Sequence, residues 1–336
     1  MNCSINRWLN RNARRSTRCL TIAAASLLGA MSMAPRAASA QQYVARADSL
    51  LRRGRVFAAE TLYYYAVRRA PRDPAARLAL GRYLAARGAL RIGAVLMEEA
   101  RFFGGDPKTV GTYLAPVYAR LGDYKALSSL PGSPLPYAQR ARAEWLGANL
   151  PAVTGPDSAV VPLYPVDSAA LGEITLVIGG DTLRAAIDPR VQGMSLDTSW
   201  LRRKSVKRFA ATFDNDWRNV GGVALSVGVG PFELTNVPTG FAPSGDPKRA
   251  KVGLDFVAQL APTLDPVTHT MMLRKSGRID RATPGERIPT LSYPGGLWLV
   301  QRDGVWPLGG ANATTTIGTR AFTLNARRGE LIIESR

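Results

Sequence analysis

Three glycines recur at a fixed interval in the first half of the chain. Gly54, Gly88 and Gly122 are separated by 34 residues and again by 34. Asp73-Pro74 and Asp106-Pro107 lie between them, and both pairs suit the start of a new helix because proline is tolerated in a first helical turn. This period restricts the segment to stacked helical hairpins, since one hairpin cannot bury its apolar face alone.

The period resembles that of the tetratricopeptide repeat, a helix–turn–helix unit of 34 residues. The residues that match its small, bulky and closing positions are Ala59, Tyr63, Ala66, Pro71, Gly81 and Gly88. Gly93 stands where the family usually has alanine, and Gly105 where it usually has proline, so the second unit is degenerate. The resemblance implies an α-solenoid over residues 41–150 that presents a groove to a peptide or protein ligand.

Residues 1–40 have the composition of a secretory signal peptide. Residues 1–18 carry five arginines and no acidic residue, residues 19–33 are uncharged, and Ala38-Ser-Ala40 is a small-x-small cleavage pattern. The uncharged run is too short to span the roughly 30 Å of hydrocarbon in a bilayer. We therefore expect an exported protein, periplasmic or extracellular and soluble after cleavage.

Metal and thiol chemistry are not expected in the exported chain. Cys3 and Cys19 both lie in the predicted signal peptide, and His269 is the single histidine of the sequence. Zinc and iron sites are usually built from several such side chains. No phosphate-binding or nucleophile motif occurs either, so we predict no metal and no cofactor.

The charge balance favours anionic partners. The net charge is +19, and removing the six arginines of the predicted signal leaves 19 − 6 = +13. For an exported protein this points to an anionic envelope polymer or membrane surface, and no nucleic acid partner is expected. The alternative is that the arginines form ordinary solvated helix faces.

The character of the sequence changes near residue 150. Residues 151–167 read as a linker, and short alternating apolar runs follow, with hairpin signals at Gly179-Gly180 and Gly230-Pro231. We predict a β domain over residues 168–277. Residues 278–336 are expected to form a β-hairpin extension or, alternatively, a truncated second lobe. The predicted fold class is α+β with two domains, helical repeats followed by an all-β barrel.

Two segments of the β domain resemble the retropepsin-like aspartic protease family. The matching residues are Asp188, Gly193 and Leu196 in the first segment, and Gly253, Leu254, Asp255, Phe256 and Asp265 in the second. The resemblance implies an acid-protease-like barrel in which Asp188 is the candidate catalytic residue.

The family's Asp-Thr-Gly is replaced here by Asp188-Pro189-Arg190. Aspartic proteolysis needs two carboxylates that share one proton. Pro189 has neither hydroxyl nor N–H, and the guanidinium of Arg190 favours an ionised Asp188. The nearest second motif, at Asp197, follows Leu196 directly and cannot form a partner loop, so a dyad would need Asp188 from two subunits.

These observations leave three functional hypotheses. The first is an exported peptide- or protein-binding protein whose protease-like domain is inactive. The second is a homodimeric aspartic endopeptidase that uses Asp188 from each subunit. The third is a basic envelope module that binds anionic polymer.

Overall fold

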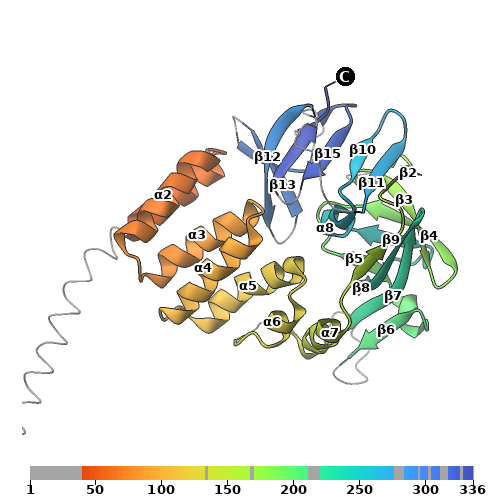
Figure 1. Cartoon of the computed structure of the whole chain (residues 1–336), viewed down its shortest axis with the longest axis horizontal. Helices are drawn as coiled ribbons and strands as arrows, with labels where there is room; N and C mark the ends of the chain where they lie inside the picture. The colour runs from red at the N-terminus through yellow and green to blue at the C-terminus, as the bar shows by residue number, and fades with distance from the viewer. Residues whose placement is uncertain are drawn as a thin grey trace, which may run out of the picture.

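The computed structural model describes residues 40–132, 135–166, 170–210, 220–275, 284–293, 296–301, 304–310, 317–325 and 328–335. The predicted signal peptide, apart from Ala40, lies outside these residues. The predicted fold class is confirmed, because helices precede residue 150 and strands follow it. Figure 1 shows the helices curving beside the β region.

The helical region is a series of antiparallel hairpins. Residues 40–52 are helical, and the helices that follow are α2 (Val56–Arg69), α3 (Pro74–Ala86), α4 (Leu90–Phe102), α5 (Pro107–Leu121), α6 (Tyr124–Ser128) and α7 (Tyr137–Ala148). Gly54, Gly88 and Gly122 lie in the reversing turns, with φ angles of 73°, 88° and 70°. These angles are in the left-handed region that favours glycine. The period read from the sequence is therefore the period of the turns.

The predicted helix starts are present. Asp73 caps α3 by accepting a hydrogen bond from the N–H of Ala75 at 3.0 Å, and Asp106 caps α5 by accepting one from Thr109 at 2.8 Å. Side chains of this kind satisfy N–H groups that have no partner within the helix. Proline follows each cap at the first helical position.

Six strands of the β region close into a barrel. They are β3 (Glu173–Ile178), β4 (Asp181–Ile187), β5 (Met194–Asp197), β7 (Gly221–Val229), β8 (Phe232–Ala242) and β9 (Arg249–Val252). Their order is β8-β5-β9-β4-β3-β7, and β7 pairs with β8 to close the ring. Both predicted hairpins are present as β3–β4 and β7–β8. The barrel encloses a continuous core that includes Leu176, Leu183 and Val252.

Further elements border the barrel. They are β1 (Ala152–Thr154), which pairs with β8, β6 (Val206–Phe209), which pairs with β7, and the short helices η1 (Thr198–Arg202), α8 (Leu254–Val257) and η3 (Ala258–Leu260).

A second sheet lies beside the barrel. Its strands are β2 (Ser158–Pro162), β10 (Thr263–Asp265), β11 (Thr270–Arg274), β12 (Glu286–Tyr293), β13 (Gly296–Gln301), β14 (Gly304–Pro307), β15 (Phe322–Asn325) and β16 (Glu330–Ile333). The order is β14-β13-β12-β16-β15-β10-β11-β2. Residues 151–167, which we expected to be a linker, contain β1 and β2 and so take part in both sheets.

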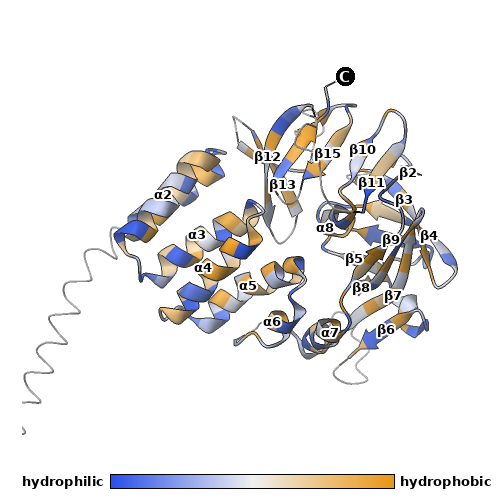
Figure 2. Ribbon diagram, in the orientation of Figure 1, coloured by the Kyte–Doolittle hydropathy of each residue, from blue (hydrophilic) through white to orange (hydrophobic). Residues whose placement is uncertain are grey.

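The helical and β regions are packed together. Val56 and Ala86 form a buried cluster with Leu291 and Val300. At the other end of the array, the ring of Trp145 on α7 lies 6.1 Å from that of Phe209 on β6. Figure 2 shows apolar and polar residues interspersed along the helices and strands. Among the described residues, no helix has both the length and the apolar character needed to cross a membrane.

Candidate functional site

The Asp188 loop connects two strands that flank a third. Strand β9 pairs in parallel with β4, which ends just before Asp188, and antiparallel with β5, which begins just after Gly193. The N–H of Asp188 donates to the carbonyl of Val252 at 2.9 Å, and the N–H of Gly253 donates to the carbonyl of Gly193 at 2.7 Å. The two segments that carried the family resemblance are thus bonded to each other through their backbones.

Both oxygens of the Asp188 carboxylate accept hydrogen bonds from Arg190. Its Oδ1 accepts from the backbone N–H of Arg190 at 3.0 Å and from Nε at 2.9 Å, and its Oδ2 accepts from Nη2 at 2.9 Å. The side chain of Asp188 is 6% exposed, whereas that of Arg190 is 60% exposed. The ion pair expected from the sequence is therefore present in bidentate geometry.

Arg190 keeps Asp188 ionised. Its side-chain hydrogen bonds lower the pKa of Asp188 against the opposing effect of burial, and the positive charge of Lys251 lowers it further. The parallel pairing of β4 and β9 places Lys251 opposite Ala186, two residues before Asp188. A carboxylate held in this way has no tendency to share a proton at neutral pH.

The carboxylate of Asp197 is held by hydrogen bonds within the fold. It accepts hydrogen bonds from the N–H of Ser199, the N–H and hydroxyl of Ser244, and the N–H of Gly245. Burial would raise the pKa of Asp197, but these hydrogen bonds outweigh it and hold the pKa well below its usual range. The side chain of Asp255, in α8, lies outside the described part of the chain.

The start of β13 lies against the Asp188 loop. A Cβ added to Gly296 would be 3.0 Å from the carbonyl oxygen of Pro189 and 3.6 Å from the Cα of Arg190. Pro189 is buried. A segment more than one hundred residues away in sequence thus packs beside the candidate catalytic residue.

No family model and no curated protein matches this chain. Among solved structures, one match is a crystal structure of a retropepsin-like aspartic protease from Rickettsia conorii. The sequence identity is 14% and the TM-score is 0.26, with 37% of this chain and 91% of the other covered.

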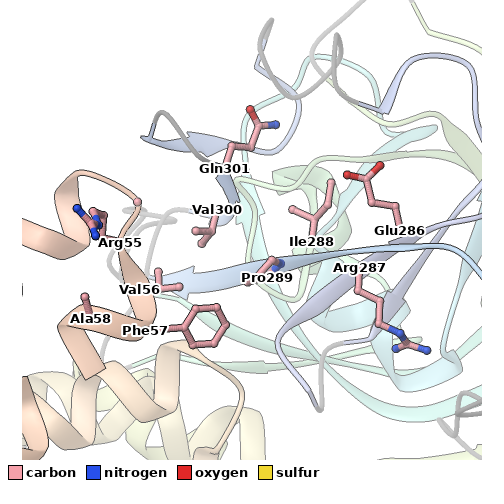
Figure 3. A pocket seen from close by; sticks show the side chains of 11 residues that line it. Arg55, Val56, Phe57, Ala58, Glu286, Arg287, Ile288, Pro289, Val300 and Gln301 are labelled. Carbon is pink, nitrogen blue, oxygen red and sulfur yellow. The ribbon is translucent and has the colours of Figure 1, made fainter. Parts of the chain in front are cut away.

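A groove of about 770 Å³ lies where the turn before α2 and the start of that helix meet the second sheet. Its lining residues are Gly54, Arg55, Val56, Phe57, Ala58, Glu286, Arg287, Ile288, Pro289, Val300 and Gln301. Figure 3 shows Val56 and Phe57 of α2 on one side, with Pro289 and Val300 of the strands beside them. Phe57 is 66% exposed although it is a large apolar residue.

The described residues contain no group of three or more side chains suited to hold a metal ion. His269 lies exposed in the turn between β10 and β11, with a φ of 53°. Its carbonyl accepts a hydrogen bond from the N–H of Leu163 at 2.9 Å. Its position is that of a turn residue.

Proposed function

We propose that this is an exported peptide- or protein-binding protein whose protease-like domain does not hydrolyse its ligand. The observation that carries the proposal is the bidentate bond between Arg190 and Asp188. Both oxygens that would activate water or hold a shared proton are occupied by a permanent cation. The export step rests on the predicted signal peptide of residues 1–40.

The binding role is supported by the groove beside α2. Its volume of about 770 Å³ falls within the range of roughly 300–1,000 Å³ that is usual for ligand sites. Phe57, which is 66% exposed, supplies apolar surface to the groove. Arg55 and Glu286 supply polar groups that can orient a ligand. Such a combination suits the side chains of a peptide.

The homodimeric endopeptidase is less well supported. It would require a second Asp188 loop against the first, but Gly296 lies beside Pro189. Strand β10 also offers no free edge to a second subunit, because it is paired on both sides, with β11 and with β15 of the same chain. We therefore expect the protein to be a monomer that does not form the dyad.

The experiment combines digestion with binding. The purified protein is incubated with a peptide library from about pH 3 to about pH 7 and the products are measured by mass spectrometry, with Asp188→Asn in parallel. We expect no cleavage by either protein. Cleavage that the Asp188→Asn variant loses would overturn the proposal in favour of the endopeptidase.

Binding is measured on the same library immobilised as an array. Phe57→Ala should weaken peptide binding, whereas Phe102→Ala, at a residue 84% exposed on α4, should not. A protein that retains anionic polymer in a salt-sensitive way but binds no peptide would overturn the proposal in favour of the envelope module.

A further inference from the structure

The guanidinium of Arg190 is held on one edge and open on the other. A guanidinium carries five N–H donors, and Asp188 takes one from Nε and one from Nη2, so 5 − 2 = 3 remain, one on Nη2 and two on Nη1. Within the described residues these donors have no acceptor. They point from a side chain that is 60% exposed.

The open edge has the geometry of a carboxylate receptor. The two terminal nitrogens of an arginine present parallel N–H groups that match the two oxygens of a carboxylate. Because Asp188 already holds the opposite edge, the side chain is ordered before a ligand arrives. A preordered side chain loses less conformational entropy on binding.

The local charge favours an anion. Asp188 contributes one negative charge, while Arg190 and Lys251 contribute two positive charges, and both cations act on the Asp188 carboxylate. Lys251 is exposed on β9, beside the loop. The loop and the neighbouring Lys251 together therefore carry a net charge of 2 − 1 = +1, and both cationic side chains are exposed to solvent.

We propose that Arg190, positioned by Asp188, is a recognition subsite for the carboxylate of a bound peptide. The inference rests on the proposed peptide-binding function and names the chemical group that the ligand presents. The carboxylate belongs either to an acidic side chain or to a free C-terminus, since both offer the same two oxygens. The loop thus recognises an anion at the position where the family resemblance implied that water would be activated.

This subsite is separate from the groove beside α2. Gly296 at the start of β13 lies against Arg190, whereas Val300 near the end of β13 lines the groove. The two residues are four positions apart, which corresponds to about 13 Å along β13. Substitutions at Arg190 and at Phe57 can therefore be tested independently.

The experiment uses fluorescently labelled peptide pools and the purified protein. The four pools share the same apolar residues and differ in their carboxylates. Two pools contain acidic side chains and two contain glutamine in their place. Of each two, one has a free C-terminus and the other an amidated one. Fluorescence anisotropy gives the affinity for each pool. We expect pools with one kind of carboxylate to bind about ten- to a hundredfold more tightly than pools without it.

The variant Arg190→Lys keeps the charge but loses the paired donors. We expect it to remove most of that preference while the fully amidated glutamine pool binds as before. The matched control is Arg249→Lys, because Arg249 is 65% exposed and also paired with a carboxylate, that of Glu173. Circular dichroism on each variant checks that the fold is retained.

The outcomes separate the two proposals. A preference for free C-termini or for acidic side chains that Arg190→Lys abolishes supports the subsite and identifies its source. Peptide binding that does not discriminate carboxylate from amide overturns the subsite but leaves the proposed function standing, as does a preference that survives in Arg190→Lys. Absence of peptide binding overturns both.

Discussion

Gly81 on α3 and Gly93 on α4 face each other so closely that neither position can hold a side chain. A Cβ added to Gly81 would lie 2.9 Å from the carbonyl oxygen of Gly93, and one added to Gly93 would lie 2.7 Å from that of Gly81. Both obstacles are backbone atoms, which cannot rotate away. Position 93, where the tetratricopeptide resemblance leads one to expect alanine, is therefore a point at which α3 and α4 approach closely.

Gly93→Ala should consequently destabilise the protein. Alanine favours a helix over glycine by about 1 kcal/mol, but forcing the two helices apart should cost more, so we expect a net loss of about 1–3 kcal/mol. Urea unfolding followed by circular dichroism measures the difference. The control is Gly147→Ala in α7, where the nearest atom is 3.6 Å away. That variant should be as stable as the wild type or more so, and equal stability of both variants would contradict the close packing.

Arg87 links the helical region to the second sheet through hydrogen bonds. Its Nη1 donates to the carbonyl of Thr290 at 3.0 Å and to that of Gly329 at 2.8 Å. Arg87→Ala leaves two carbonyls without this donor, and we expect a loss of about 1–3 kcal/mol in unfolding free energy. It should also raise the rate of proteolysis between the array and the sheet. Arg91→Ala, at an exposed residue on α4, is the control and should change neither quantity.

The turns and caps of the helical region follow from local chemistry, and this is why the sequence predicts them. Gly54 and Gly88 sit where only a residue tolerant of positive φ fits easily, and Asp73 caps the helix that begins one residue later. The contact between Gly81 and Gly93 is different. It joins two helices. The sequence shows an unusual glycine at position 93 but does not show which residue of the neighbouring helix lies opposite it.

Some contacts of the candidate site can likewise be predicted from the sequence, and others cannot. The bond between Asp188 and Arg190 spans two residues and could be anticipated from the dipeptide that replaces the family's Thr-Gly. The approach of Gly296 depends on how the second sheet packs on the barrel, and nothing near position 296 signals it. The position of Lys251 is predictable only in part. Lys251 precedes Val252-Gly253, and its position near Asp188 follows only once β9 is known to pair with β4.

A chain of hydrogen bonds joins β10 to β15. The Nη1 of Arg274 donates to the hydroxyl of Thr263, the hydroxyls of Thr263 and Thr323 are 2.7 Å apart, and that of Thr323 donates to Glu334. The cation at one end and the carboxylate at the other fix the direction, so Thr263 donates to Thr323. Both threonines are buried.

Thr263→Val and Thr323→Val should therefore be energetically coupled. Each substitution alone leaves the other hydroxyl without its buried partner, at a cost of about 1–3 kcal/mol. The double variant should cost less than the sum of the two, with a coupling of at least about 0.5 kcal/mol. A double-mutant cycle in urea measures it. Additive losses would mean that the two hydroxyls do not bond to each other.

Acid should remove the contribution of Asp188 to stability. Its pKa is lowered in the folded protein by Arg190 and then by Lys251, so the ionised form stabilises the fold above the unfolded pKa of about 3.9. This contribution is lost as the pH falls through the lowered folded-state pKa. We expect Asp188→Asn to be less stable than the wild type by about 1–2 kcal/mol at neutral pH, a modest value because the Arg190 side of the pair is solvated.

The pH dependence distinguishes this ion pair from a packing effect. Below the unfolded pKa of about 3.9 the unfolded chain takes up this proton first, and at still lower pH the folded wild-type carboxyl also becomes neutral and resembles the amide of the variant. The difference between the two proteins should therefore shrink as the pH is lowered. Asp181→Asn provides the comparison, since Asp181 is 51% exposed in its pair with Arg203 and should change stability by less than about 0.5 kcal/mol. The midpoints of urea unfolding, measured for the three proteins across the acid range, test this pH dependence. A deficit in Asp188→Asn that stays constant into strong acid would mean that shape, and not charge, holds the loop.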